Sequence, residues 1–419
     1  MADIEKCIFV YDSFSEESPI LLGRLYVSAL RGGETYSFEY EKEWLKKTGL
    51  SLLLDPHVMS VSGRQFSDDR RLFGFLADSA PDRWGRTLMN RRERILAEKE
   101  GRKPRKLYES DYLLGVFDET RMGGLRFRKE PDGAFVSDDK EMSAPPWSTL
   151  RTLEAASRNF EKDEAGTAEK WLNQLIKPGS SLGGARPKAT VVDTKGQFWI
   201  AKFPSKHDEN DTGAWEMVAH DLAESCGLNV PSAKLEQFSK NGSTYLVRRF
   251  DRDGQKRIHF ASAMTMLGKQ DGASAADGTG YMDIVSFIRS QGVRVKDDLL
   301  ELWKRIVFNM AISNTDDHLR NHAFLLTKDG WTLSPLFDVN PVPYGDELQL
   351  NVDELDNRIS IELAIAVAPR FGIDTQAAEA MADEMIRIVR ENWKKLAGKY
   401  GLSRGQIENM RPAFQICEI

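Results

Sequence analysis

The apolar positions of this chain follow two different periods, and the change between them divides the sequence. Near the N-terminus, segments such as CIFVYD, LLGRLYV and TYSFEY alternate or run apolar, which is typical of β-strands. Residues 82–101 instead space their apolar side chains as a helix does and end at Gly101. The pattern therefore predicts a mixed α/β segment over residues 1–145. We place its end there because the stretch 130–148 is rich in charge and turn formers.

After that boundary the strands become fewer and the helices longer. Helices predicted at about 149–160 and 165–177 lead to a loop that contains two serines and three glycines. The strand QFWIAKFP, the helix TGAWEMVAHDLAES and the strands AKLEQFS and STYLVRRF then form a small antiparallel sheet with one helix, and beyond about residue 255 nearly every periodic segment is helical. We therefore expect an α+β fold, with a small lobe over 146–252 and a mainly helical lobe over 253–419 in addition to the N-terminal subdomain.

Composition and charge narrow the class of protein. The 419 residues carry a net charge of −6 and have an isoelectric point near 5.7, so the surface as a whole does not resemble that of a nucleic-acid binder. Segment 82–106 is the exception, with ten Lys or Arg against four Asp or Glu. This segment is either the solvated face of a helix or a docking surface for an acidic partner or DNA.

The sequence also indicates where the protein works. No apolar run approaches the roughly 18 residues of a membrane span, and the N-terminus lacks the features of a signal peptide. The three cysteines, Cys7, Cys226 and Cys417, are far apart and form no CxxC motif. We expect a cytoplasmic protein with reduced thiols and no membrane segment.

The densest group of polar residues is ISNTDDHLRNH at 312–322, directly behind the apolar run LLELWKRIVFNMAI. Within it, Asp316 and Asn321 have the separation of the catalytic aspartate and the magnesium-binding asparagine of protein kinases. The carboxylate would orient an attacking hydroxyl, and the amide oxygen would bind a magnesium ion that bridges phosphates. We expect the last turn of the preceding helix to present both residues, whereas Asp317 is one position out of register.

Two further segments fit the same reaction. Asp338 follows the apolar strand WTLSPLF seventeen residues beyond Asn321, where kinases place a second magnesium ligand. Upstream, Lys202 lies in an apolar strand and Glu216 opens a helix fourteen residues later. That is the order of the lysine–glutamate pair that positions nucleotide phosphates in kinases, and the ordered set is more specific than any of its members.

The loop SSLGGARPK at 180–188 precedes all of these residues. Gly183 and Gly184 would let backbone N–H groups approach a phosphate, and Arg186 and Lys188 add positive charge. The loop matches neither the Walker motif nor GxGxxG, so on its own it is a weak signal for phosphate binding.

Other interpretations of these residues stay open. His318 and His322 have the spacing of two zinc ligands on a helix, but the HExxH motif is absent, and either histidine can serve as hydrogen-bonded scaffolding. The nucleophile elbow GxSxG is also absent, and Cys226 has no evident base partner. A small-molecule phosphotransferase would have the same Asp–Asn spacing, and a degenerate ATP-binding module that regulates transcription is a third alternative.

In the order of its motifs, the chain resembles the HipA family of bacterial toxin serine/threonine kinases. The resemblance rests on SSLGGARPKA, WIAKFP, VRRFDR, NTDDHLRNH and PLFD, which span roughly residues 180–340. It implies an N-terminal α/β subdomain and a kinase-like domain whose C-terminal lobe is largely helical. Asp316 would then be the catalytic aspartate, with Asn321 and Asp338 as Mg²⁺ ligands.

The resemblance also assigns the ATP site. It implies contacts to ATP from Lys202 and His318, and a hinge beside the adenine at Arg248, Arg249 and Phe250. The remaining residues assigned to the ATP site are Gly183, Gly184, Ala185, Arg186, Lys188, Glu216 and Asn321. Kinases of this family autophosphorylate a serine of the glycine-rich loop, which by motif register is Ser181 here, with Ser180 as the second choice.

Partners follow from the same resemblance. Family members phosphorylate proteins of translation, notably aminoacyl-tRNA synthetases, and so halt growth. A small helix-turn-helix antitoxin of the HipB type neutralises them, and the complex binds operator DNA. This chain departs from the family in reading ARPK in the loop and in carrying Asp317 and Arg320 in the catalytic stretch, but no catalytic or metal position is changed.

Overall fold

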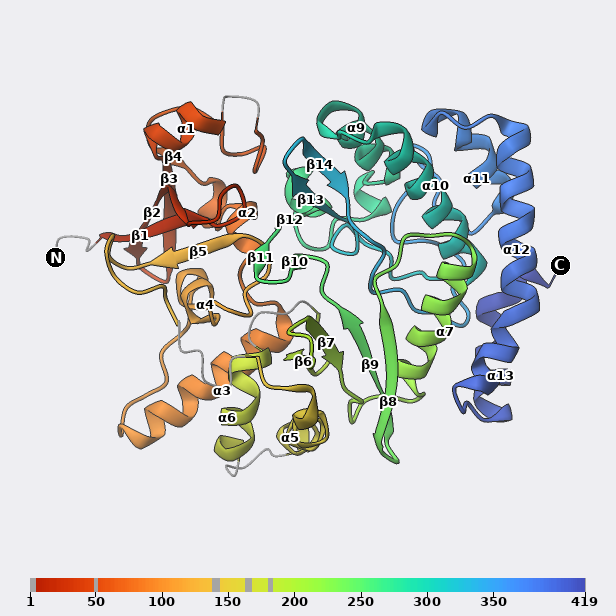
Figure 1. Ribbon diagram of the computed structural model, residues 1–419, viewed down its shortest axis with the longest axis horizontal. Helices are drawn as coiled ribbons and strands as arrows, with labels where there is room; N and C mark the ends of the chain where they lie inside the picture. Colours follow the sequence, from red (N-terminus) through yellow and green to blue (C-terminus); the bar gives the residue numbers. More distant parts are fainter. Residues whose placement is uncertain (1–4, 49–51, 138–143, 163–167, 180–183, 419) are drawn as a thin grey trace. The chain divides into compact units, whose positions relative to one another are not determined.

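The computed structural model describes residues 5–48, 52–137, 144–162, 168–179 and 184–418. The chain divides into two compact units (Figure 1). The first unit comprises residues 1–207 with 248–261, and the second comprises 208–247 with 262–419. Each unit is therefore built from two separate stretches of the sequence.

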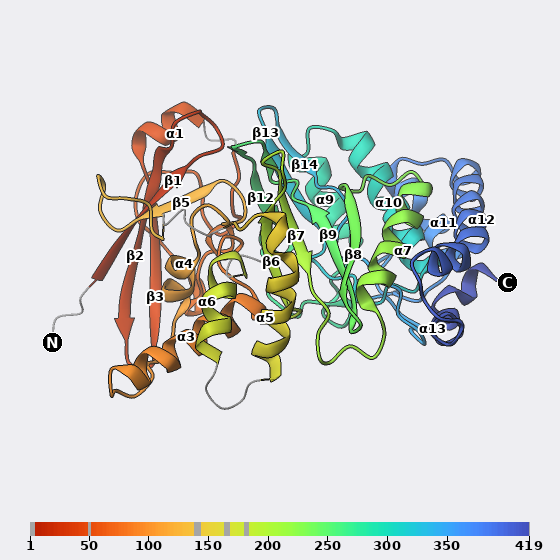
Figure 2. The same ribbon diagram turned by 60° about the horizontal axis from the view of Figure 1, so that its bottom comes forward.

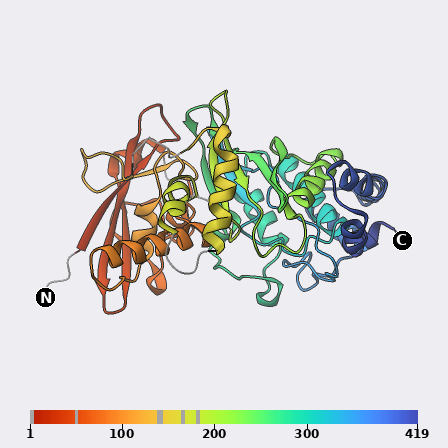
Figure 3. The ribbon, with the colours of Figure 1, turned by 90° about the horizontal axis from the view of Figure 1, so that it is seen from below.

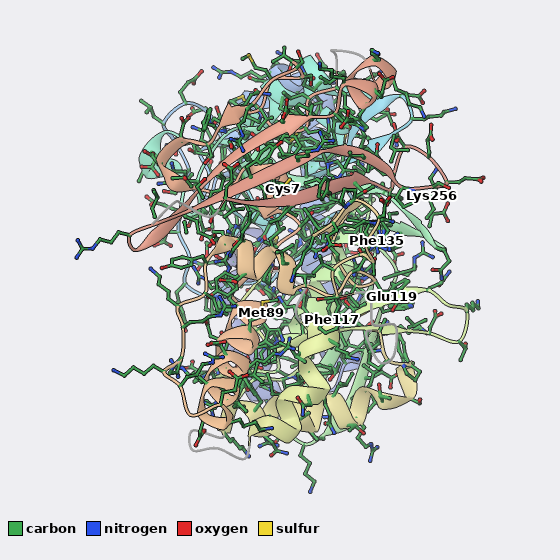
Figure 4. All side chains as sticks on the ribbon, turned by 90° about the vertical axis from the view of Figure 1, so that its left-hand side faces the viewer. Cys7, Met89, Phe117, Glu119, Phe135 and Lys256 are labelled. Carbon is green, nitrogen blue, oxygen red and sulfur yellow. The ribbon has the colours of Figure 1, made fainter. Side chains whose placement is uncertain are left out.

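The first unit contains a five-stranded antiparallel sheet in the order β4-β3-β2-β1-β5. Its strands are β1 (Glu5–Asp12), β2 (Ile20–Leu30), β3 (Gly33–Tyr40), β4 (Gln65–Phe66) and β5 (Leu125–Arg128). Ile8 on β1 pairs with Leu25 on β2, which pairs with Phe38 on β3, and all three are at most 2% exposed. The alternation in the sequence therefore places one face of the sheet in the core. Figure 4 looks onto this unit and labels Cys7 on β1 and Phe135 after β5.

Helices and a second hairpin complete the first unit. The helices are α1 (Lys42–Thr48), α2 (Gly74–Ala77), α3 (Arg83–Lys99), α4 (Glu109–Gly115), α5 (Leu150–Lys162) and α6 (Ala168–Gly179). Strands β6 (Lys188–Val192) and β7 (Phe198–Lys202) pair antiparallel. Asp82 caps α3 at its N-terminus by accepting a hydrogen bond from the Arg83 backbone N–H. Helix α3 packs beside α6, as Figures 2 and 3 show in orange and yellow-green.

The second unit is mainly helical. Its strands are β8 (Ala233–Ser239), β9 (Gly242–Arg248), β13 (Ala323–Thr327) and β14 (Gly330–Leu333), which form two antiparallel hairpins. Its helices are α7 (Thr212–Ser225), α8 (Ala263–Met266), α9 (Tyr281–Gln291), α10 (Val295–Ala311), α11 (Ile361–Val367), α12 (Thr375–Lys399) and α13 (Arg404–Met410). The long α12 packs against both α7 and α10 (Figure 1).

Short elements connect these parts. They are β10 (Arg252–Asp253), β11 (Lys256–Arg257), β12 (His259–Ser262) and the 3₁₀ turns Asp68–Arg70, Trp147–Thr149, Ala275–Asp277, Ala368–Phe371 and Arg411–Cys417. Helix α10 is the buried support of the second unit, since Trp303, Ile306 and Phe308 are fully buried. The Trp303 indole N–H donates to the Ala364 carbonyl at 2.8 Å, which ties α10 to α11.

The α+β class expected from the sequence is confirmed. One expectation is wrong: α10 ends at Ala311, so its last turn does not present Asp316 and Asn321, which lie in the following loop. Polar side chains that compete for backbone hydrogen bonds explain the early end, because Ser313 and Asn314 follow directly. Within the described residues, no helix combines the length and the apolar character needed to cross a bilayer.

Candidate active site

The loop between α10 and β13 begins with a side-chain cap. The backbone N–H of Asn314 donates to the Asn309 carbonyl at 2.8 Å, and Asn314 Nδ2 donates to Asn309 Oδ1 at 3.0 Å. Ser313 adopts a left-handed φ of 48°, which turns the chain away from the helix axis. The carboxamide of Asn309, a fully buried residue in the last turn of α10, therefore fixes where the loop starts.

Asn321 connects the loop to the segment that carries Asp338. Its Nδ2 lies 3.0 Å from the Asp316 carbonyl oxygen and 3.5 Å from the Asp338 carbonyl oxygen. The structure thus brings together the three residues that the kinase spacing singled out. Asp316 is exposed, whereas Asn321 is only 5% exposed. The buried carboxamide of Asn321 therefore connects the backbone of Asp316 to that of Asp338.

Asp338 has a φ of 57°, a left-handed conformation that is uncommon for residues other than glycine. Such a backbone costs free energy and persists when surrounding contacts impose it, which occurs often at functional sites. It is the second left-handed residue in this region, after Ser313.

Asp317, which the sequence placed out of register, is the centre of a buried polar network. Its Oδ2 accepts hydrogen bonds from Tyr281 Oη at 2.5 Å and Asn309 Nδ2 at 2.8 Å, and lies 2.8 Å from His322 Nε2. The donors come from the start of α9, from α10 and from the residue before β13. The carboxylate of Asp317, which lies between Asp316 and Asn321 in the sequence, therefore connects the loop to all three of these elements.

The electrostatics of this network favour an ionised Asp317. Burial opposes the charge, but the electrostatic interaction and hydrogen bond with His322 and the hydroxyl of Tyr281 outweigh it and lower the pKa of the Asp317 carboxyl below its usual value. Burial and the neighbouring Asp317 raise the pKa of Tyr281 well above its usual value, so that its hydroxyl remains a donor. Both effects keep the loop in the bonding pattern seen here.

Glu216 is a buried carboxylate of the second unit. It is 4% exposed on α7, and its charge acts with that of Asp338 on Tyr245 of β9. Burial, followed by these two negative charges, raises the pKa of Tyr245 well above its usual value. Glu216 and Asp338 therefore both act electrostatically on the same buried tyrosine.

In the first unit, two buried lysines face each other across a hairpin. Lys188 on β6 is directly opposite Lys202 on β7, and they are 5% and 8% exposed. Residues directly opposite on adjacent strands project to the same face of the sheet, so their positive charges add there. This face favours a multiply charged anion such as a polyphosphate.

The start of α3 bonds to Gly184 and Lys188, the two ends of the described part of the glycine-rich segment. The Gly184 N–H donates to Asp82 Oδ2 at 2.6 Å, and the Trp84 N–H donates back to the Gly184 carbonyl at 3.0 Å. The Trp84 indole N–H also donates to the Lys188 carbonyl at 2.9 Å. Gly184 needs to be glycine, because its φ is +77° and a side-chain carbon there would lie 2.6 Å from Lys188 Nζ. No local pattern in the sequence predicts these contacts.

The other residues assigned to the ATP site differ in their surroundings. Arg248 and Ala185 are exposed, and Phe250 is half-buried. Arg186 donates from Nε to the Phe203 carbonyl at 3.0 Å. The Arg249 guanidinium pairs with Asp251 at 2.7 Å and donates to the Thr120 carbonyl at 2.7 Å, so its side chain is committed to structure. His318 is half-buried, and Ser180, Ser181 and Gly183 lie outside the described residues.

Lys202 and Glu216, predicted to act as a pair, belong to different units, and their pairing stays a prediction. The zinc alternative loses support, because His322 Nε2 is engaged by Asp317. A carboxylate and a carboxamide oxygen, as Asp338 and Asn321 offer, are the hard oxygen ligands that Mg²⁺ prefers. With Asn321 Nδ2 bonded to two carbonyls, Oδ1 is the side-chain atom suited to a cation.

Two family models match the chain. The model described as the HipA-like C-terminal domain matches residues 180–393, and the model described as the HipA N-terminal domain matches residues 20–102. The first match covers the lysine hairpin, the loop after α10 and Asp338.

Individual relatives agree with these matches. The Sinorhizobium fredii protein Y4mE, whose name includes the word kinase, is 31% identical over 224 residues, which cover 48% of this chain and 50% of that protein. The serine/threonine-protein kinase toxin HipA of Shewanella oneidensis is 25% identical over 237 residues, covering 49% of this chain and 52% of that protein. The matched region thus spans about half the length of these curated relatives.

One solved structure is similar over nearly the whole chain. It is a chain of the Shewanella oneidensis complex of HipA, HipB and operator DNA, with a TM-score of 0.64 at 18% identity, covering 98% of this chain and 96% of that chain. This likeness shows a shared fold.

Proposed function

This chain belongs to the HipA family, and we propose that it is a Mg²⁺- and ATP-dependent protein serine/threonine kinase. The observation that carries the proposal is the Asn321 carboxamide, which bonds to the backbones of both Asp316 and Asp338. A kinase needs a catalytic carboxylate and its magnesium ligands held at fixed separation, because phosphoryl transfer depends almost entirely on positioning and charge stabilisation.

The residues have distinct tasks in this reaction. Lys188 and Lys202 hold the phosphates of ATP, and Asn321 and Asp338 hold magnesium, which neutralises charge on the phosphates when it is bound. Exposed Asp316 orients the acceptor hydroxyl and accepts its proton. Glu216, Arg186 and the hinge at 248–250 complete the nucleotide site by analogy with the family.

Asp317 is a positioning residue in this account. It touches neither the acceptor nor the nucleotide, but its three hydrogen bonds fix the turn that joins Asp316 to Asn321. A loop outside regular structure needs such a buried anchor to hold its functional groups within a fraction of an ångström.

Regulation and partners follow the family pattern. We propose autophosphorylation on Ser181 of the glycine-rich loop and phosphorylation of a protein of translation, such as an aminoacyl-tRNA synthetase, which would arrest growth in the cytoplasm. The similar chain from Shewanella oneidensis was solved with HipB and operator DNA. A helix-turn-helix antitoxin of that type, and operator DNA through it, are the partners we propose here.

The test is intact-mass analysis with phosphosite mapping, before and after incubation with Mg²⁺ and ATP. The wild type should gain phosphate on Ser181, and Asp316→Asn should lose at least about 100-fold of that rate, because it removes the proton acceptor. Asp383→Asn, an exposed change on α12, is the matched control. Equal phosphorylation of Asp316→Asn and wild type would contradict the proposal, and transfer to small metabolites without any phosphoprotein would favour the small-molecule alternative.

A further inference from the structure

An exposed aromatic residue lies close to the candidate catalytic aspartate in the second unit. Gly345 approaches Thr315, the residue before Asp316, so closely that a side-chain carbon on Gly345 would lie 2.3 Å from Thr315 Cγ2. Tyr344, the residue before Gly345, is 80% exposed. A tyrosine that turns its ring to solvent beside a catalytic loop leaves a large apolar surface for a partner to cover.

The same segment forms one wall of a groove. The groove has a volume of about 420 Å³ and is lined by Ser274, Glu347, Gln349, Asn351, Leu355 and Asn357, among others. It begins at Glu347, three residues beyond Tyr344, which is within about 10 Å along an extended chain. Leu355 at its edge is 88% exposed.

The walls of the groove are held by hydrogen bonds, so the groove is preformed. The Ala275 N–H donates to the Gln349 carbonyl at 2.8 Å, and Asn351 Nδ2 donates to the Ala275 carbonyl at 3.1 Å. On the other side, Asn357 Nδ2 donates to the Leu348 carbonyl at 2.7 Å. A preformed groove loses little conformational entropy when a ligand binds.

The charge beside the groove is mainly negative, and the one cation opposite Glu347 in the local backbone pairing is Arg358. Asp346 and Glu347 are exposed and form no salt bridge within the described part of the chain. The nearby Arg358 is instead paired with Asp356, and Arg370 with Glu354. A lysine or arginine of a partner therefore finds two carboxylates available to it.

We propose that residues 344–357, the docking segment, bind an extended stretch of a substrate protein. Tyr344 packs on a side chain next to the acceptor hydroxyl, and the groove takes a basic side chain further along the bound stretch. Extended peptides are recognised in this way, by a surface that receives side chains at intervals along the chain. This inference rests on the proposed kinase function and gives it a substrate class, a polypeptide with a basic residue near its serine or threonine.

A serine-centred positional-scanning peptide library with labelled Mg²⁺-ATP tests the docking segment. The wild type should prefer Lys or Arg over Glu at one flanking position by about three- to fivefold, as expected of one exposed ion pair. The variant Glu347→Lys should reverse the preference at that position, which loss of folding cannot do. Tyr344→Ala should raise the KM for the preferred peptide about tenfold, while the KM for ATP stays the same.

Matched controls separate the surface from general effects. Asp383→Lys makes the same charge change on the exposed side of α12, and Phe66→Ala removes another ring that is 72% exposed, in the first unit. Neither should alter the peptide preference. An unchanged preference in Glu347→Lys, or no peptide phosphorylated by a protein that phosphorylates itself, would overturn the docking segment and leave the kinase proposal standing. Absence of any phosphoryl transfer by the wild type would contradict both.

Discussion

The two charged regions of this molecule are built in different ways. In the first unit, Lys188 and Lys202 project from the regular strands of a hairpin, and the strand register alone places them side by side. In the second unit, Asp316 and Asn321 lie in an irregular loop, and a buried network centred on Asp317 holds them. A regular element positions side chains through its backbone hydrogen bonds, whereas a loop needs buried side chains to do the same.

This difference predicts where each region is vulnerable. Changes to single side chains should disturb the loop through its anchors, while the lysine hairpin should respond mainly at the lysines themselves and at the contacts that hold the neighbouring glycine-rich loop.

The largest effect is expected at the anchor of the loop. Asp317→Leu would leave the donors of Tyr281, Asn309 and His322 without their acceptor in the core. We expect the free energy of unfolding to fall by about 3–5 kcal/mol, measured by urea denaturation. Tyr281→Phe, which removes one donor only, should cost about 1 kcal/mol. A loss below 1 kcal/mol in Asp317→Leu would show that the network does not hold the loop.

A titration should distinguish the two units. In the first unit, burial lowers the pKa of His259 from 6.5 to about 4. The neutral ring is favoured in the folded state, so this contribution is fully present above pH 6.5 and is lost as the pH falls toward 4, by about 3 kcal/mol in all. Asp317 also has a lowered pKa, so its contribution is present above its unfolded value of 3.8 and is lost only below it.

Thermal unfolding of the wild type and of His259→Gln between pH 4 and 7 tests whether stability is lost through His259 in this range. The variant should lose much less stability than the wild type over that range. Parallel curves for the two proteins would contradict the assigned role of His259.

A smaller effect is expected at Gly345, whose backbone packs closely against Thr315 of the loop. Gly345→Ala places a carbon against Thr315 Cγ2 and should cost about 1–3 kcal/mol, with slower phosphoryl transfer because Thr315 precedes Asp316. Gly398→Ala is the matched control: Gly398 is inside α12 with open space around it, so alanine should stabilise the protein by up to about 1 kcal/mol. The melting temperature should fall in Gly345→Ala and rise in Gly398→Ala. Equal changes of melting temperature in the two variants would refute the close approach of Gly345 to Thr315.

The smallest effect is expected at the start of α3. Asp82→Ala removes a helix cap and the acceptor of the Gly184 N–H, so about 1 kcal/mol of stability should be lost. The dissociation constant for ATP should rise about fivefold, since the loop beside Lys188 loosens. Isothermal titration calorimetry measures the affinity for ATP, and Asp383→Ala, a change at an exposed position on α12, should not alter that affinity.

Sequence alone could predict what periodicity and spacing express. The α+β class, the main helices and strands, and the proximity of Asp316, Asn321 and Asp338 follow from apolar periods and from one known spacing. Asp317 is out of register for the catalytic role because its separation from Asn321 differs from the kinase spacing, yet that separation is irrelevant to a buried anchor. Tyr281 and Asn309 lie far from it in sequence, so their hydrogen bonds to it leave no local signal. Trp84 likewise donates to the Lys188 carbonyl across about a hundred residues of sequence.

We propose that the loop after α10 performs phosphoryl transfer while the lysine hairpin binds the nucleotide. The most direct test of this division measures, on the same preparations, the affinity for Mg²⁺-ATP and the rate of autophosphorylation in Asp316→Asn and Lys202→Met. We expect Asp316→Asn to keep its affinity for Mg²⁺-ATP within about threefold and to lose phosphoryl transfer, whereas Lys202→Met should lose at least about tenfold in affinity. An Asp316→Asn protein that transfers phosphate normally, or a Lys202→Met protein that binds ATP as tightly as the wild type, would contradict it.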